Sequence, residues 1–480
     1  MTGPVVPLGE GGQALVDRAM DRVAGGRPVP GNKVELLFDG PVVYPAMFER
    51  IRAAERWIHL DNYIIRDDDT GRAMIAALAE RARSGVRVRV LTDWFGSWTT
   101  KRRLWNDLRA AGGEVRYYQP PDFLHLSSNL TRDHRKLLVS DGKLGVTGGL
   151  CIGNEWAGDP SRGRQPWRDT GISVDGPAAA MLDSAFAAVW NRIGTPLPDD
   201  ELASDIPALG NIEVRVVAGE PGGVRGARTT ELLLAGAAQR VWLTDAYLVA
   251  PRGIYRALVD AASEGVDVRL LVPGTSDLPH IRNLTRTGYR ELLRSGVRVF
   301  EWRGPMLHAK TIVVDGRWSR VGSTNMNLSS LIANYELDVL VDSEDIAHQL
   351  ESQFRRDLDQ SAEVLLRQSR FRSSLTFRPP EASPGSHARG MREKRRRTVV
   401  TLRAVMSGSQ RALLAQGSLV VTVMAGLLIF FPRAMGLTFG FLTVYLFLTS
   451  VLRLGQKRRR DALPERRKVD RPTDIRLGEQ

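Results

Sequence analysis

The sequence predicts an α/β protein of two similar halves related by a pseudo-twofold axis, followed by a C-terminal helical hairpin in a membrane. The first observation is a repeat: His134-x-Lys136-x4-Asp141 recurs 174 residues later as His308-x-Lys310-x4-Asp315. The second is that strand–helix–strand patterns surround both copies, which favours a mixed sheet sandwiched by helices in each half. The third is a pair of long uncharged apolar segments near the C-terminus.

The expected segments follow from composition along the chain. Gly and Pro residues before residue 32 predict a flexible arm, and this stretch has no apolar run of the kind a signal peptide carries. A Pro-rich, acidic stretch near residue 200 predicts the boundary between the halves. Ser and Pro residues after residue 372 predict a linker that cannot bury a core. The predicted segments are 1–31 (arm), 32–195 (first half), 196–210 (inter-half linker), 211–360 (second half), 361–412 (basic linker), 413–453 (two transmembrane helices) and 454–480 (basic tail).

The two apolar segments, Leu413–Phe431 and Ala434–Leu452, each contain 19 residues and no charge. About 20 apolar residues cross a bilayer core, so a hairpin of two short spans is expected. Basic clusters flank both outer ends, which places both termini and the catalytic body on the cytoplasmic side of the inner membrane. A re-entrant hairpin that never crosses is the alternative, because the spans are short and Arg433 lies between them.

The charge distribution bears on the substrate. The net charge of the 480 residues is +13, and residues 389–480 hold 19 Lys/Arg against 6 Asp/Glu, a difference of +13. The remaining body is therefore neutral on balance, whereas a nuclease would be expected to carry its positive charge there. No nucleic acid is expected as a partner. The single cysteine excludes a disulfide framework.

Each repeated motif is expected to place its His and Lys on one phosphate. The apolar runs that follow, such as Leu137–Val139, indicate buried strands, and residues i and i+2 of a strand point to the same face. His and Lys therefore share a face, with a nucleophile, an acid and cations for a phosphodiester. The motif's Asp completes the set, but it lies at the strand end and is expected to close the turn. The candidate catalytic residues are His134, Lys136, Asp141, His308, Lys310 and Asp315.

The residues downstream of each motif also repeat. Gly149 and Ser323 occupy equal offsets, where small residues let backbone N–H groups approach an anion. Asp169 and Glu336 each begin a further strand. A histidine that attacks through one ring nitrogen needs the other held as a donor, and a carboxylate is the usual partner.

With these motifs the chain resembles the phospholipase D superfamily, and within it the bacterial cardiolipin synthases. The resemblance covers roughly residues 32–360 and includes Ser84–Asp93, Gly265–Gly274, Met306–Lys310 and Gly322–Asn325. It implies two phospholipase D-type α/β sandwich halves and a metal-free transfer that needs no cofactor.

The resemblance also implies roles for the site residues. His134 would attack phosphorus to form a covalent phosphatidyl-histidine, and His308 would act as acid and base, although the two histidines are not distinguished by sequence. Asp169 would orient His134, and Glu336 would orient His308. Lys136 and Lys310, with Gly149, Ser323 and Asn325, would bind the phosphate oxygens.

One position departs from the family pattern. Cys151 stands where the second half has Asn325, and a thiol is a poorer hydrogen-bond donor than an amide. Asn154, three residues further on, is expected to be able to compensate. A small buried residue is the simpler interpretation of Cys151.

The predicted function is therefore a membrane-anchored phosphatidyltransferase that acts on anionic phospholipids such as phosphatidylglycerol and releases glycerol. A hydrolase of the same fold acting on phospholipid, or less plausibly on nucleic acid, is the alternative. An inactive scaffold is disfavoured because His and Lys are intact in both motifs.

Overall fold

The computed structural model describes residues 10–121, 131–203, 205–369 and 372–378. These residues fall within one compact unit, Met1–Val399. The expected hairpin and basic tail lie outside the described residues. No helix within the described ranges is both long enough and apolar enough to span a bilayer.

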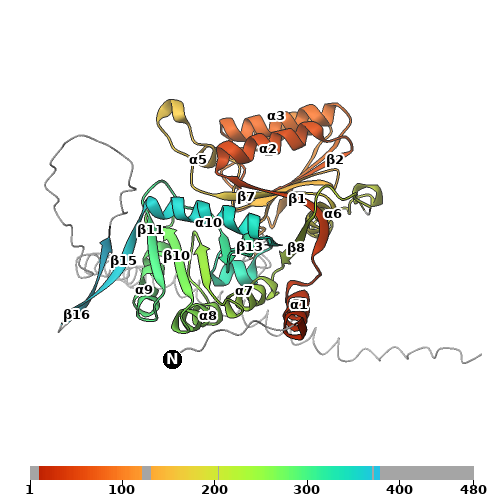
Figure 1. The fold of residues 1–480 in the computed structure, drawn as a ribbon. Coiled ribbons are helices and arrows are strands. Elements are labelled where there is room, and N and C mark those ends of the chain that lie inside the picture. The colour runs from red at the N-terminus through yellow and green to blue at the C-terminus, as the bar shows by residue number, and fades with distance from the viewer. Residues whose placement is uncertain (1–9, 122–130, 204, 370–371, 379–480) are drawn as a thin grey trace, which may run out of the picture. The chain divides into compact units, whose positions relative to one another are not determined.

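The first half is a seven-stranded sheet with helices on both faces, as Figure 1 shows. Helices α2 and α3 lie side by side on one face, and α6 packs on the other. Asp68 caps α3 by accepting a hydrogen bond from Gly71 N, and apolar residues at helical spacing bury one side of this helix. The elements are β1 (Val29–Phe38), α2 (Gly40–Ala53), β2 (Trp57–Asn62), α3 (Asp69–Arg83), β3 (Arg87–Asp93), α4 (Asn106–Ala110), β4 (Glu114–Tyr118), β5 (Lys136–Ser140), β6 (Leu144–Gly148), α5 (Asn154–Ala157), β7 (Thr170–Asp175) and α6 (Pro177–Arg192).

The second half repeats this plan. Its strands run in the order β8-β14-β13-β12-β9-β10-β11, which matches β1-β7-β6-β5-β2-β3-β4 position by position. Helix α10 corresponds to α6, and α7 and α8 lie side by side on the other face (Figure 1). The elements are β8 (Ile212–Gly219), α7 (Arg225–Ala235), β9 (Arg240–Thr244), α8 (Arg252–Ser263), β10 (Asp267–Pro273), α9 (Pro279–Arg294), β11 (Arg298–Trp302), β12 (Thr311–Val314), β13 (Trp318–Gly322), β14 (Glu336–Asp342) and α10 (Glu344–Asp359). The expectation of two similar α/β halves is confirmed.

The halves meet sheet against sheet and strand against strand. Strands β1 and β8 pair antiparallel, with Val29 opposite Val214, so the described strands form one continuous 16-stranded sheet. One apolar core cluster contains residues of both halves, including Val174, Phe186, Val321 and Val339. The interface between the halves is thus a hydrophobic core, which fixes the two motifs relative to each other.

Two expected segments differ in the structure. Glu10–Ala24 forms helix α1, although residues 1–31 were expected to be a loose arm. Met20 and Ala24 recur at i and i+4 and are buried where α1 packs on α7 and β8, and this packing outweighs the glycines around the helix. Strands β15 (Ser361–Ser369) and β16 (Arg372–Arg378) extend the second sheet beyond β11, inside the segment expected to be a linker.

Candidate active site

The two motif histidines sit on parallel bridges that cross between the halves. His134 N donates to Tyr335 O at 3.0 Å, and Asp133 pairs with Tyr335. In the symmetric contact, His308 N donates to Arg168 O at 2.7 Å, and Leu307 pairs with Arg168. Each histidine therefore lies beside the residue that directly precedes the carboxylate residue of the opposite half, Glu336 for His134 and Asp169 for His308.

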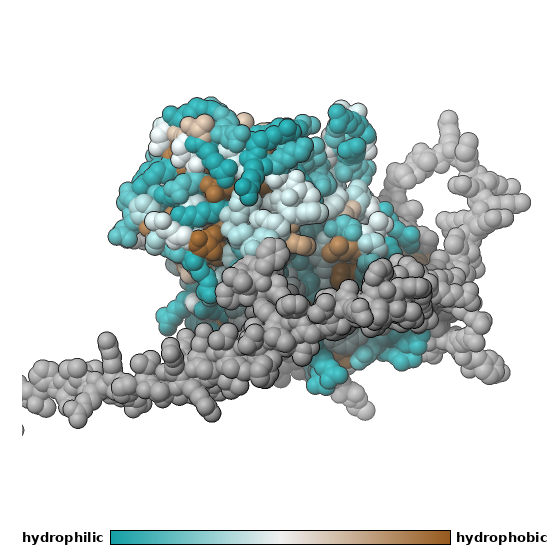
Figure 2. All heavy atoms as spheres, turned by 180° about the vertical axis from the view of Figure 1, so that it is seen from behind, coloured by the Kyte–Doolittle hydropathy of each residue, from teal (hydrophilic) through white to brown (hydrophobic). Residues whose placement is uncertain are grey.

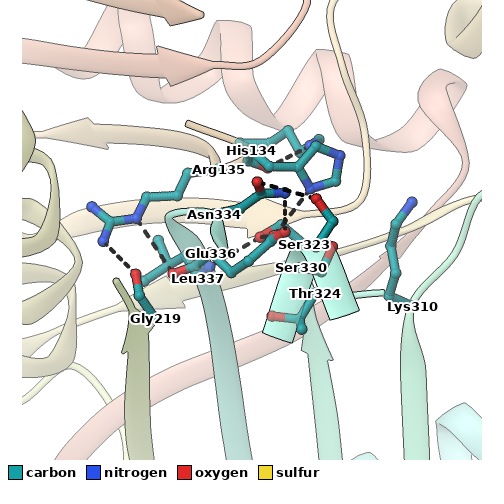
Figure 3. Close-up of polar contacts among 12 residues, drawn as sticks. His134, Arg135, Gly219, Lys310, Ser323, Thr324, Ser330, Asn334, Glu336 and Leu337 are labelled. Atoms are coloured by element: carbon teal, nitrogen blue, oxygen red, sulfur yellow. Dashed lines mark hydrogen bonds and ion pairs between the residues drawn. The ribbon is translucent and has the colours of Figure 1, made fainter. Parts of the chain in front are cut away.

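Because of these bridges, each histidine contacts the carboxylate of the opposite half. His134 Nδ1 lies 3.0 Å from Glu336 Oε2, and Figure 3 shows both side chains turned toward each other. His308 Nδ1 lies 2.7 Å from Asp169 Oδ2. The expectation that Asp169 orients His134 and Glu336 orients His308 is wrong, because each carboxylate strand is bridged to the motif of the other half.

Ser323 holds the Glu336 carboxylate in place. Its hydroxyl donates to Glu336 Oε2 at 2.5 Å and accepts from Leu337 N at 2.9 Å, a contact visible in Figure 3. Gly149 is the counterpart beside Asp169, and a Cβ there would lie 2.1 Å from Asp169 Oδ1. The amide of Gly149 donates to Thr170 O. Ser323 and Gly149 were predicted to bind phosphate. The Ser323 hydroxyl and the Gly149 amide instead donate to protein oxygens.

The motif lysines are buried beside the histidines. Lys136 Nζ donates to His134 O, and Lys310 Nζ donates to His308 O. Lys310 Nζ also lies 2.9 Å from His308 Nδ1. Burial lowers the pKa of Lys310 to about 8, against the opposing charge of Asp169. Two cations are therefore concentrated where a phosphodiester would need them.

The electrostatic setting keeps both imidazoles neutral in the free protein. Burial, together with the charge of Lys310, lowers the pKa of His308 to about 4. Burial also lowers the pKa of His134, and Lys136 adds to the effect. Burial alone would raise the pKa of Asp169, but its pairing with His308 and the charge of Lys310 bring it below the usual range. A neutral imidazole that donates Nδ1–H to a carboxylate leaves the Nε2 lone pair free.

The motif aspartates bind backbone N–H groups at the start of a neighbouring strand, β2 for Asp141 and β9 for Asp315. Asp141 accepts hydrogen bonds from the backbone N–H groups of Glu55, Arg56 and Trp57 at 2.8–2.9 Å. Asp315 accepts in the same way from Ala238, Gln239 and Arg240 at 2.8 Å. Both oxygens of each carboxylate are used there, so the role of these residues is structural.

Aromatic rings surround the histidines unequally, and the tryptophans were missed by sequence reasoning. The rings of Trp156 and Trp167 lie 5.6 and 5.8 Å from the His308 ring, centroid to centroid. The Tyr247 ring lies 6.0 Å from the His308 ring, and the Tyr63 ring lies 4.9 Å from the His134 ring. Nothing in the repeat marked Trp156 or Trp167. His308 is the more enclosed of the two.

Cys151 is a buried core residue. It is 1% exposed, packs among the apolar side chains of the first half, and its carbonyl accepts from Tyr44 Oη at 2.7 Å. Asn154 does not replace it, because Asn154 Oδ1 accepts from Thr70 N and Thr70 Oγ1 at the start of α3. Asn325 is buried, and its Oδ1 has no hydrogen-bond partner in the described structure.

A second acidic pair lies behind His134. Asp61 and Asp133 are fully buried, and none of their carboxyl oxygens finds a hydrogen-bond partner in the part of the chain described. Burial, and then the charge of Asp133, raises the pKa of Asp61 well above its usual range. The strand register pairs Asp61 with Leu137 and Thr244 with Thr311, so Asn62, rather than Asp61, corresponds to Asp245.

Across the described ranges, no group of three or more His, Cys, Asp or Glu is arranged to hold a metal ion.

Comparisons with known proteins agree with this architecture. The model described as "Cardiolipin synthase, PLD-like domain" matches residues 47–155 and 232–358. A cardiolipin synthase of Halalkalibacterium halodurans is 32% identical over 76% of this chain and 73% of its own length. One of Geobacillus kaustophilus is 34% identical over 68% of this chain and 66% of its own length. Among solved structures, phosphatidylserine synthase of Haemophilus influenzae has a similar fold, with a TM-score of 0.58 at 14% identity, covering 73% of this chain and 92% of that one.

Proposed function

The chain belongs to the phospholipase D-like cardiolipin synthase family, and on that basis we propose that it joins two phosphatidylglycerol molecules into cardiolipin and releases glycerol. The observation that carries the proposal is the pair of crossed histidine–carboxylate contacts at one interface, each with a buried lysine beside it. A phosphodiester bound there meets a nucleophile, a proton carrier and two cations.

In the first step His134 is the nucleophile. Its Nε2 forms a bond to phosphorus, and the bond from phosphorus to the glycerol oxygen of the donor lipid breaks. The departing oxygen takes a proton from Nε2 of His308. Glycerol leaves, and the phosphatidyl group remains on His134.

In the second step the glycerol hydroxyl of another phosphatidylglycerol attacks the same phosphorus. Nε2 of His308 takes the proton of that hydroxyl, and the nitrogen–phosphorus bond breaks. His134 is restored, His308 is again protonated, and cardiolipin is the product. General acid–base steps of this kind contribute about 10²–10⁴-fold each.

The unequal surroundings support this division of roles. Trp156, Trp167 and Tyr247 enclose His308, which favours proton exchange with a bound alcohol over exchange with water. The side chain of His134 is 12% exposed and is open to an incoming phosphodiester.

Substrate binding favours the protonated form of His308, which takes its proton from solvent. In the free protein the lysine charges contribute to its low pKa. An anionic phosphodiester offsets those charges, so its binding raises the imidazole pKa and favours proton uptake at Nε2. Lys136 and Lys310 then stabilise the charge that develops on the phosphoryl oxygens.

We also propose a location for the protein. The uncharged segments Leu413–Phe431 and Ala434–Leu452 form a membrane hairpin, and the flanking basic clusters keep the catalytic body on the cytoplasmic side of the inner membrane. A chain truncated after Arg378 should turn over detergent-dispersed phosphatidylglycerol while losing most of its activity on vesicles. Equal vesicle activity of the truncated and full chains would contradict the anchor.

The function is tested with purified full-length protein and phosphatidylglycerol vesicles, the products being resolved by lipid mass spectrometry. Cardiolipin with an equal amount of glycerol supports the transferase. Phosphatidic acid without cardiolipin would mean that water is the acceptor, and an unchanged lipid would overturn the proposed donor.

A further inference from the structure

The described surface exposes a group of large apolar side chains on the loops that bear the active site. Phe95 and Trp98 follow β3, Leu278 follows β10, and Leu328 and Ile332 follow β13. The strand register puts these loops at the sheet ends where the motif lysines lie. We call these five residues the apolar rim. Trp98 is 68% exposed and Leu328 is 61% exposed. Figure 2 shows several separate patches of hydrophobic colour on the uncovered part of the face seen from behind.

Hydrogen bonds tie the first rim loop to His134. Asp93 at the end of β3 accepts from Phe95 N at 2.9 Å and from Asp133 N at 3.0 Å, and Asp133 directly precedes His134. The guanidinium of Arg132 lies over the Phe95 ring, 5.3 Å from its centroid. The loop with Phe95 and Trp98 therefore borders the His134 side of the site.

The other two loops border the site from the second half. Tyr247, whose ring faces His308, donates its hydroxyl to Asp277 at 2.8 Å, and Leu278 is the next residue. Leu328 and Ile332 stand in the segment between Asn325 and Glu336. That segment leads to Tyr335, whose N–H donates to Arg132 O at 2.8 Å, beneath Phe95. The rim thus borders both histidines.

Positive charge beside the apolar rim indicates which kind of partner the rim contacts. Lys101 and Arg102 follow Trp98 and are exposed, whereas the next residue, Arg103, lies 3.7 Å from Asp67. Exposed apolar side chains with a Trp among them, flanked by exposed cations, match the interface of an anionic lipid bilayer. A protein partner would have to leave Lys101 and Arg102 in solvent or supply carboxylates that pair with them.

We propose that the apolar rim inserts into the interfacial layer of an anionic phospholipid bilayer, so that the active-site mouth faces the membrane surface. The proposal rests on the proposed function, because a phospholipid headgroup must reach the buried His308 as well as the partly exposed His134. With the rim in the bilayer, a headgroup enters the site without the acyl chains leaving the membrane.

The first test measures membrane depth in the full chain. Cys151 is buried, so Trp98→Cys or Leu328→Cys provides one accessible thiol for an environment-sensitive fluorophore. Val42→Cys on α2 and Leu15→Cys on α1 are matched controls, being 49% and 62% exposed in the native protein. The proteins are reconstituted in phosphatidylglycerol/phosphatidylethanolamine vesicles that contain a lipid spin-labelled near its headgroup.

Strong quenching at positions 98 and 328, with little at 42 and 15, is the expected result. Equal quenching at all four positions would overturn the proposal. A blue-shifted but unquenched label at position 98 would also overturn it, since the rim would then be covered by protein, such as a second copy of this chain.

The second test measures turnover by the Trp98→Ser/Leu328→Ser variant. Activity on phosphatidylglycerol vesicles should fall about tenfold, because less apolar surface enters the bilayer. Activity on dioctanoyl phosphatidylglycerol below its micelle concentration should stay within about twofold. An equal loss on both substrates would overturn docking by the rim. No turnover of either substrate by the unsubstituted protein would instead contradict the proposed function, and the quenching result would stand independently.

Discussion

Each histidine of the site depends on a carboxylate that comes from the opposite half of the chain. Glu336→Gln should therefore alter His134, and Asp169→Asn should alter His308, because an amide no longer fixes the Nδ1–H tautomer. Each variant should lose about 10²–10⁴-fold in turnover, as for other groups that orient a catalytic base.

Turnover alone does not show which histidine is affected. ¹⁵N-histidine NMR of the seven histidines, assigned with single His→Gln variants, identifies it. In Glu336→Gln the His134 signals should shift while those of His308 stay in place. Shifted His308 signals would contradict the crossed arrangement.

The lysine beside His308 should set the alkaline limit of activity. The pKa of Lys310 is lowered to about 8, so its ammonium is present below that pH and is lost as the pH rises through it. We expect the fall of kcat/KM with rising pH to become steeper above about pH 8. Lys310→Arg should lower kcat/KM but remove this steeper part, because a guanidinium stays charged throughout. A steeper fall that persists at the same pH in Lys310→Arg would assign the limit to another group.

Gly149 should tolerate no side chain. A Cβ at this position would lie 2.1 Å from Asp169 Oδ1, so Gly149→Ala displaces the carboxylate that holds His308. We expect turnover to fall by about 10²-fold or more, since small displacements of a catalytic group have this effect. Gly226→Ala is the control, because its Cβ meets no atom closer than 4.0 Å. Comparable activity of the two variants would show that Asp169 can relocate.

The sequence predicted which side chains form the site better than it predicted their partners. The spacing of His134 and Lys136, repeated at His308 and Lys310, identified the reacting groups because strand geometry puts i and i+2 on one face. The pairing with Glu336 and Asp169 arises from bridges between the halves, and distance along one chain carries no information about them. Trp156 and Trp167 were missed for the same reason.

Among the elements, α1 shows how tertiary contacts stabilise a helix in a segment whose Gly and Pro content predicted a flexible arm. Arg215 of β8 is 4% exposed, and its guanidinium contacts Asp21 Oδ1 of α1 at 2.8 Å. Asp21→Asn leaves that cation without its charged partner, at a cost of about 1–3 kcal/mol. The change should appear as a lower Tm in thermal unfolding.

A surface pair provides the comparison for that measurement. Asp69 is 77% exposed and contacts Arg72, so Asp69→Asn should cost less than about 1 kcal/mol. If Asp21→Asn is no more destabilised than Asp69→Asn, α1 contributes nothing through this contact.

Element boundaries were predicted correctly where the periodicity of apolar residues was strong. They were predicted wrongly where composition was used instead. Gly and Pro content suggested a loose start, but Met20 and Ala24 find a surface on α7 and β8. Strands β15 and β16 were missed because edge pairing with β11 depends on a neighbour far away in sequence. The correspondence between Asn62 and Asp245 likewise becomes visible only in the strand register.

At the scale of the whole molecule, the two halves should provide one active site and not two. His134→Ala and His308→Ala should each reduce turnover by at least about 10²-fold, because both histidines act on the same phosphorus. The double variant should be no slower than the single variants, which circular dichroism should show to be folded. Two independent sites would leave each single variant with about half of the activity.

The bridges between the halves also have a consequence during synthesis of the chain. The first half leaves the ribosome with His134 in place, but Glu336 is translated some 200 residues later and Asp169 has no histidine to hold until His308 follows. A chain that ends before Glu336 therefore lacks the carboxylate that orients His134. We expect transfer chemistry only after translation has passed Glu336, so unfinished copies of the enzyme should leave the surrounding lipids unchanged.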